Sequence, residues 1–283
     1  MDKKPNVIMI CNNKGGVGKT TTTIELSASL ARKGKKVLTI DMDPQGNLTK
    51  YVGLELNQDV NLRDVLNNIK DYVDPLSNGC ELIGKTACIP TNENFDVIRS
   101  NKLLEKASIE FSNPGDELSL KDYIDTIDGY DYIFLDCAPA KSQLYNMALL
   151  AADYCIIVAE SDPGSLDGIL EVVKDVILLK RNNTSAPEIL GALLTKDKMA
   201  RVQRDAYNTV SDVYGPKYGV YPFSTTIPDG IAATDAKVKK LSIHAFWEQG
   251  NREDKRKAKA QTVSYESLCD EMLERIDMFQ HNN

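Results

Sequence analysis

The sequence predicts an α/β protein with a doubly wound, mostly parallel sheet that carries helices on both faces. Short, continuously apolar runs alternate along the chain with longer helical patterns. Unbroken apolar runs are typical of parallel strands that are buried on both sides. A glycine-rich loop follows the first run and opens a helix, an arrangement found at the carboxyl edge of such a sheet.

Each expected element rests on one of these patterns. Apolar runs predict strands at 6–11, 36–41, 95–100, 130–136, 153–160 and 188–195. Helical spacing predicts helices at 20–33, 61–70, 142–151, 165–181 and 200–214. Gly34 follows the first helix and is suited to end it, because glycine adopts left-handed backbone conformations without strain.

The remaining segments show weaker patterns. Residues 71–94 and 105–128 follow neither periodicity, and we expect surface excursions there. A basic stretch occupies 237–259, and a helical pattern follows at 264–280. Since the chain has no internal repeat and no clear boundary, residues 1–283 are expected to form one domain with an elaborated C-terminal end.

Composition excludes several classes of protein. A net charge of −7 argues against a general nucleic-acid coat but leaves local basic patches open. No run approaches eighteen apolar residues and the N-terminus lacks an export signal, so we expect a cytoplasmic protein without a membrane span. The six scattered cysteines include no CxxC pair, which favours reduced thiols over a metal or iron–sulfur site.

The strongest functional signal is the segment KGGVGKTT, which comprises Lys14, Gly15, Gly16, Val17, Gly18, Lys19, Thr20 and Thr21. Glycines let backbone N–H groups face a polyphosphate, and the following helix start adds the positive end of its dipole. Lys19 is expected to bind the β and γ phosphates, and Thr20 to offer its hydroxyl to Mg²⁺. The segment therefore predicts a nucleotide site of the P-loop NTPase type.

Carboxylates follow two of the predicted strands. Asp41 and Asp43 end one strand in LTIDMDPQGN, and Asp136 ends another in YIFLDCAPA. An aspartate at such a strand end can hold Mg²⁺ through a water molecule. Asp41 and Asp43 need not share a role, since one can support the metal while the other reaches the attacking water.

These motifs resemble those of the ParA/MinD family of deviant Walker ATPases, most closely the Soj-type ParA partition ATPases. The family patterns K-G-G-x-G-K-T-T, D-x-D-P-Q-x-N and a Walker B aspartate followed by prolines stand here at 14–21, 41–47 and 136–139. Looser similarity extends over roughly residues 6–240. The resemblance implies an ATPase whose cofactors are ATP and Mg²⁺.

The resemblance also implies individual roles. Lys14 matches the signature lysine, which reaches across an ATP-induced homodimer to the partner's nucleotide, like an arginine finger supplied in trans. Asp43 matches the residue that positions the attacking water, and Asp41 the neighbouring switch aspartate near the metal. Thr20 and Asp136 match the direct and water-mediated partners of magnesium.

Base recognition is implied at the loop from Pro228 to Gly230, with Thr195 at the end of the preceding strand nearby. The chain departs from the family pattern in this loop, where Asp229 and Gly230 replace the usual basic or amide residue. It also departs after Walker B, where DCAPA replaces the commoner double proline.

As a ParA-like protein, the ATP-bound dimer is expected to bind DNA without sequence preference at the nucleoid, together with a centromere-binding, ParB-like partner. Two basic clusters fit this role. The candidate DNA-binding residues are Lys196, Lys198, Arg201 and Arg204 in one cluster and Lys237, Lys255, Arg256 and Lys257 in the other. We favour Arg201 and Arg204, because the second cluster reads as a flexible, solvated stretch with internal pairs such as Glu253 with Lys257.

Three alternatives share these motifs. A MinD-like membrane-binding ATPase is disfavoured because the C-terminal helical segment carries five acidic residues against Arg275 alone, and anionic lipid would repel it. An iron–sulfur scaffold ATPase lacks its cysteine pair here. A ParA-like positioner of protein cargo stays open, since the partner determines the cargo.

Overall fold

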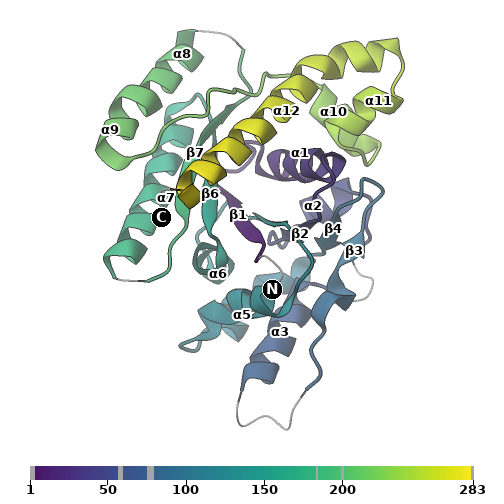
Figure 1. Ribbon diagram of the computed structural model, residues 1–283, viewed down its shortest axis with the longest axis vertical. Coiled ribbons are helices and arrows are strands. Elements are labelled where there is room, and N and C mark those ends of the chain that lie inside the picture. Colours follow the sequence, from purple (N-terminus) through teal and green to yellow (C-terminus); the bar gives the residue numbers. More distant parts are fainter. Residues whose placement is uncertain (1–3, 57–59, 75–79, 183, 199–200, 282–283) are drawn as a thin grey trace.

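A seven-stranded sheet forms the centre of the computed structural model, which describes residues 4–56, 60–74, 80–182, 184–198 and 201–281 (Figure 1). Its strand order is β3-β4-β2-β5-β1-β6-β7. Neighbouring strands are parallel except for the short β3–β4 pair. The strands are β1 (Asn6–Cys11), β2 (Val37–Asp41), β3 (Ile89–Pro90), β4 (Asp96–Ile98), β5 (Tyr132–Asp136), β6 (Tyr154–Glu160) and β7 (Glu188–Thr195). The predicted fold class is confirmed.

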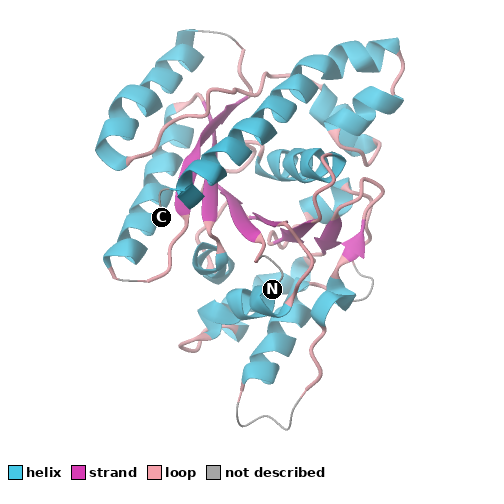
Figure 2. Ribbon diagram, in the orientation of Figure 1, coloured by secondary structure: helices cyan, strands magenta, loops and turns pink. Residues whose placement is uncertain are grey.

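Helices cover both faces of the sheet (Figure 2). One face carries α1 (Lys19–Arg32), α10 (Ala232–Val238), α11 (Ile243–Gln249) and α12 (Arg252–His281). The opposite face carries α3 (Leu62–Val73), α5 (Ser119–Thr126), α6 (Gln143–Ala151) and α7 (Pro163–Arg181). A separate hydrophobic core lies on each face, which explains why the strands read as continuous apolar runs.

Shorter helices connect these layers. They are α2 (Asn47–Tyr51), α4 (Ala107–Glu110), α8 (Arg201–Asn208) and α9 (Gly215–Tyr218), with a π-helical turn at Thr209–Tyr214 between the last two. Single 3₁₀ turns occur at Gly84–Ala87, Lys102–Lys106 and Asp116–Leu118. Within the described part of the chain, no helix is both long and apolar enough to cross a bilayer.

The sheet brings the motif-bearing strand ends to one edge. In the register of the central strands, Ile10 lies opposite Asp136, and Asp136 lies opposite Asp41. The P-loop leaves the end of β1, which lies next to β5, and leads into α1. The carboxyl edge of β1, β2 and β5 therefore holds all three sequence motifs, as expected for this type of sheet.

The prediction of surface excursions at 71–94 and 105–128 is wrong in large part. Helix α3 continues to Val73, and the second segment holds α4 and α5. Phe111, Leu120 and Tyr123 are fully buried or nearly so, which makes this segment part of the core. Its elements are too short to show a clear periodicity. Residues 75–79 of the first segment lie outside the described residues.

The C-terminal prediction also changes. Residues 264–280 are helical as expected, but the helix begins at Arg252 and includes the second half of the basic stretch. Its first buried positions are Ala258, Gln261 and Thr262. Because these residues are small or polar, the hydropathy pattern does not reveal the first turns of the helix. In the predicted helix at 200–214, α8 and the π-helical turn cover 201–214, and Ala200 lies outside the described residues.

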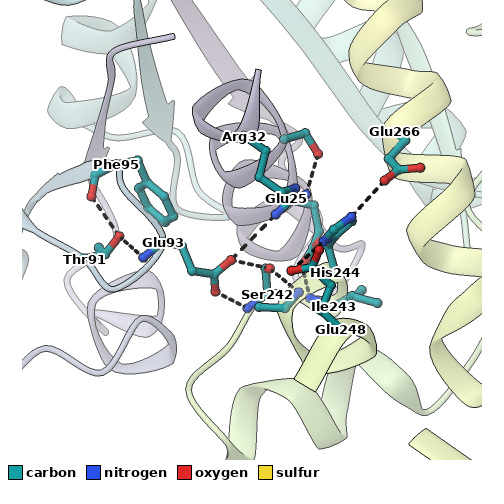
Figure 3. A network of polar contacts seen from close by, with 12 residues as sticks. Glu25, Arg32, Thr91, Glu93, Phe95, Ser242, Ile243, His244, Glu248 and Glu266 are labelled. Carbon is teal, nitrogen blue, oxygen red and sulfur yellow. Dashed lines mark hydrogen bonds and ion pairs between the residues drawn. The ribbon is translucent and has the colours of Figure 1, made fainter. Parts of the chain in front are cut away.

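A polar network fastens α11 to α1 (Figure 3). Glu25 of α1 accepts a hydrogen bond from the backbone N–H of Ile243 at 2.7 Å. Glu93 accepts from the N–H of Ser242 at 2.6 Å, and Nε2 of His244 lies 2.9 Å from Oε1 of Glu266 in α12. The carboxylates thus satisfy N–H groups at the start of α11 and hold the C-terminal helices against α1.

Candidate active site

A cavity of about 450 Å³ lies at the carboxyl edge of the sheet. The P-loop and the start of α1 form its floor. Its walls come from the β2–α2 segment, from the loop after β7, and from α10 and α12. The residues that line it on these walls include Asp43, Asn47, Tyr51, Thr195, Pro228, Gly230, Lys237, Gln261 and Tyr265.

The P-loop conformation depends on its glycines. Gly16 and Gly18 have φ angles of 80° and 98°, which side chains rarely tolerate. Helix α1 starts at Lys19 without a side-chain cap, so its first N–H groups remain directed at the cavity edge. Gly15, Gly16, Gly18, Thr20 and Thr21 line the cavity, whereas Val17 is fully buried in the core behind the loop.

Lys19 closes the loop from inside. Its Nζ donates a hydrogen bond to the backbone carbonyl of Lys14 at 2.9 Å, and only 7% of the residue is exposed. Burial lowers the pKa of Lys19, an effect that the nearby Asp136 carboxylate opposes. A largely buried ammonium at the floor of a glycine-rich loop is suited to bind phosphate oxygens.

Asp136 has one oxygen engaged and one free. Its Oδ1 accepts from the hydroxyl of Thr23 at 3.1 Å, while its buried Oδ2 has no hydrogen-bond partner. Burial, reinforced by Asp41, raises the pKa of Asp136 to about 8. Such a carboxyl is costly unless a cation or a water of its shell meets it. The Thr20 and Asp136 side chains therefore fit a magnesium ion.

The structure separates Asp41 from Asp43. Asp41 is fully buried and accepts from the N–H and the hydroxyl of Thr49, at 2.9 and 2.7 Å, and from the N–H of Asp43. It ties the end of β2 to α2 and is not among the residues that line the cavity. Burial raises its pKa to about 6. Asp43 does line the cavity, and its Oδ1 accepts from the N–H of Gln45 at 2.9 Å.

Lys14 projects away from the loop. Its Nζ lies 2.6 Å from Oδ1 of Asp162, and 39% of its side chain is exposed. Asp162 is the N-cap of α7 and also accepts from Ser165. Asn12 braces the front of the loop, since its Oδ1 accepts from the N–H of Lys14 and its Nδ2 donates to the carbonyl of Val158.

The predicted adenine-side residues share one wall. Pro228 and Gly230 line the cavity, and the Pro228 carbonyl accepts from Nε2 of Gln261 at 3.0 Å. Thr195 also lines it, but its hydroxyl donates to the backbone carbonyl of Val17 at 2.7 Å and thereby supports the P-loop. Gln261 and Tyr265 of α12 were missed, because no motif marks them and they lie more than thirty residues beyond the loop.

The first basic cluster is partly paired. Nζ of Lys196 lies 2.6 Å from Glu160, and Nζ of Lys198 lies 3.5 Å from Asp229. Arg201 is 92% exposed along its side chain, and Arg204 is exposed on the same short helix α8. Since Arg201 has only a long 3.7 Å contact to Asp205, α8 presents the accessible positive charge of this cluster.

The second basic cluster is dispersed. Lys257 pairs with Glu253 at 3.1 Å, as the alternative interpretation expects, and Nζ of Lys255 stands over the Trp247 ring. Arg256 is exposed on α12. Lys237 instead lines the nucleotide cavity. The interpretation of this cluster as a flexible stretch is wrong, because residues 252–259 form the first turns of α12.

Comparison with known proteins identifies relatives of this chain. A family model for an AAA domain matches residues 5–189. The chain is 34% identical over 235 residues to the sporulation initiation inhibitor protein Soj of Bacillus subtilis, which covers 81% of this chain and 87% of that protein. It is also 34% identical to the chromosome partitioning protein ParA of Myxococcus xanthus, over 74% of this chain and 70% of that protein.

One solved structure with a similar fold was determined with bound ligands. Cobyrinic acid a,c-diamide synthase from Mycobacterium smegmatis, with a bound ATP analog and magnesium, superposes with a TM-score of 0.69 at 26% identity and covers 88% of this chain and 98% of its own. The P-loop, the Walker B carboxyl of Asp136 and the sequence relatives all point to the same family. The chain belongs to the ParA/MinD family of P-loop ATPases, and its cofactors are ATP and Mg²⁺.

Proposed function

We propose that this protein is a DNA-partition ATPase that forms an ATP-dependent homodimer. The observation that carries the proposal is the second lysine of the P-loop. Lys19 already serves the loop of its own chain, whereas the half-exposed Lys14 points outward and forms an ion pair with Asp162. A cation in that position is suited to stabilise charge that develops on the nucleotide of a second subunit.

Within each subunit the roles follow from position. Lys19 and the backbone of Gly15–Thr21 bind the triphosphate, and Thr20 and Asp136 hold magnesium, which supplies charge neutralisation on the phosphates. Asp43, exposed to the cavity, positions the attacking water. Asp41 supports this group from behind through its bonds to Thr49 and Asp43. Pro228, Gly230 and Thr195 line the same cavity and would contact the base.

The dimer would bind DNA through exposed positive charge. A dimer carries two copies of α8, and hence two pairs of Arg201 and Arg204. Because each patch releases counterions from DNA, two patches give a higher DNA affinity than one. Lys196 and Lys198 flank this helix, and Lys255, Arg256 and Lys257 form a weaker second surface. Support comes from the relatives, whose names are those of a chromosome partitioning protein and of Soj.

In this account, the whole chain is one domain that acts at the nucleoid in the cytoplasm with a centromere-binding, ParB-like partner. Hydrolysis stimulated by that partner releases the dimer from DNA beside its cargo. The experiment is sedimentation of the protein with ATP or ADP, alone and with a duplex of arbitrary sequence. Dimers that form with ATP and sediment with DNA support the proposal. ATP-dependent dimers that ignore DNA would instead favour a positioner of protein cargo.

A further inference from the structure

Among the described residues, Lys19, Lys196 and Lys237 are the lysines that line the nucleotide cavity, and Lys237 comes from a helix far from the P-loop. Lys237 belongs to α10 and lines the cavity together with Asp43, Asn47 and Tyr51 from the β2–α2 segment. These are the residues that follow the strand end beside Asp136. Lys237 therefore reaches the cavity on the same side as Asp43, whose expected role is at the phosphate end.

The ammonium of Lys237 lacks an anionic partner among the residues that the structure describes. Its Nζ instead lies over the aromatic ring of Tyr51, 4.7 Å from the ring centroid. Neighbouring lysines differ in this respect: Lys239 pairs with Asp254 at 3.2 Å, and Lys257 pairs with Glu253 and Asp235. A partly buried ammonium that rests on an aromatic face is desolvated without a counter-charge, which is unfavourable until an anion arrives.

The carboxyl groups around it do not supply that charge. Burial lowers the pKa of Lys237, while the fields of Asp136 and Glu25 oppose this and that of Lys196 adds to it. Asp136 and Glu25 are both buried, and neither forms an ion pair or hydrogen bond with Lys237 among the described residues. The cavity thus holds a second cation, on α10, that no carboxylate of the described residues contacts, in addition to Lys19 of the P-loop.

We propose that Lys237 of α10 binds the phosphate chain of the nucleotide together with the P-loop. The Lys237 ammonium leaves the Tyr51 ring when the phosphates enter. The affinity for ATP therefore depends on α10, a helix outside the three motifs. The inference rests on the ATPase site but not on DNA binding or partition. If Lys237 served only to pack on Tyr51, its removal would change the affinity for every ligand by the same factor, whatever the number of phosphates.

The test compares nucleotides that differ in phosphate number. We would measure binding of ATP, ADP, AMP and adenosine by titration calorimetry, with Mg²⁺ and without DNA. In Lys237→Met, ATP affinity is expected to fall about 10- to 100-fold, the range for one charge-assisted hydrogen bond. The loss shrinks with each phosphate removed and vanishes for adenosine, whereas Lys237→Arg retains most of the ATP affinity.

Lys217→Met is the matched control, because Nζ of Lys217 also stands over a tyrosine ring, that of Tyr218 at 5.1 Å, outside the cavity. It should bind all four ligands like the wild type. The melting temperature of the ligand-free Lys237→Met protein separates a binding effect from unfolding. Unchanged ATP affinity in the folded variant, or an equal loss for ATP and adenosine, overturns the inference. A wild-type protein that binds ATP but not DNA would refute partition and leave the inference standing.

Discussion

Lys14 and Asp162 form an ion pair within one chain, with 2.6 Å between Nζ and Oδ1. The pair joins the front of the P-loop to the N-terminus of α7, where Asp162 also caps the helix through Ser165. Both side chains are about two-fifths exposed, so the pair contributes at most about 1 kcal/mol. A contact this weak can hold Lys14 in its own subunit and still yield to a nucleotide phosphate across a dimer.

The first prediction concerns the exchange of Asp162 for the partner's phosphate as the contact of Lys14. Asp162→Asn removes the charge that retains Lys14 but keeps a side-chain oxygen for the α7 cap. We expect the ATP-dependent dimer to become tighter by up to about 30-fold, because each dimer releases two such pairs and each pair is worth at most about 1 kcal/mol. Sedimentation equilibrium with ATP measures this change. Lys14→Ala, which should bind ATP but dimerise poorly, is the companion variant, and a weaker dimer in Asp162→Asn would contradict the exchange.

The second prediction separates binding from hydrolysis. Asp43→Ala removes the cavity-facing carboxylate and leaves the phosphate loop intact, so ATP binding should persist. Hydrolysis should fall by roughly 10²- to 10⁴-fold, the usual range for a group that acts on the attacking water. Phosphate release under single-turnover conditions measures the rate, and calorimetry with ATP measures the affinity.

Asp41→Ala provides the contrast for that experiment. It leaves both Thr49 donors without their acceptor, so it should lower the free energy of unfolding by roughly 1–3 kcal/mol. Near-normal turnover in Asp43→Ala, combined with a stable but inactive Asp41→Ala, would reverse the two roles.

The third prediction follows from the buried network of Figure 3. Burial raises the pKa of Glu25 to about 8, while its bond from Ile243 opposes the shift and the nearby Glu93 adds to it. The folded protein therefore keeps a proton on Glu25 that the unfolded chain releases near pH 4.5. Because the folded state binds more protons, its stability should fall as pH rises from about 5 to 8.

Glu25→Gln should remove this contribution, since glutamine keeps an acceptor for Ile243 and does not titrate. The slope of unfolding free energy against pH should become shallower by up to about 1.4 kcal/mol per pH unit. Urea unfolding of both proteins at several pH values gives the slopes. Identical slopes would show that Glu25 is ionised in the folded protein.

The sequence predicted the parts of the site that local chain geometry defines. Gly16, Gly18 and Lys19 sit in one short loop whose backbone requirements are visible in the residues themselves. Asp136 was visible as the charged end of an apolar strand. Lys237 could not be assigned correctly, because neighbours such as Lys239 and Lys240 made it look like part of a solvated patch, and only the packing of α10 turns it inward.

The C-terminal helix shows the same limit. Gln261 and Tyr265 reach the cavity because α12 crosses α1, a tertiary contact that leaves no local signature. Its first turns carry five basic residues and bury Ala258 among them. A stripe that starts with alanine, glutamine and threonine is too polar to stand out as an apolar helical face.

The fourth prediction ranks the two basic surfaces. Replacing Arg201 and Arg204 by glutamine should weaken DNA binding equally for unrelated sequences, because phosphate contacts carry no sequence information. Replacing Lys255, Arg256 and Lys257 should have the smaller effect, since Lys257 is already paired with Glu253. Fluorescence anisotropy with two unrelated duplexes measures both variants. A larger loss in the α12 variant would move the main DNA surface to that helix.

The central claim is tested most directly by the salt dependence of DNA binding by the wild-type protein with ATP and with ADP. Neutralising some 4–6 phosphates predicts a log–log slope of roughly −4 to −5 with ATP. With ADP, binding should be lost or much weaker, because the dimer does not form. If the ATP-bound protein fails to bind duplex DNA at an ionic strength of about 50 mM, where phosphate contacts are strong, the partition account is contradicted.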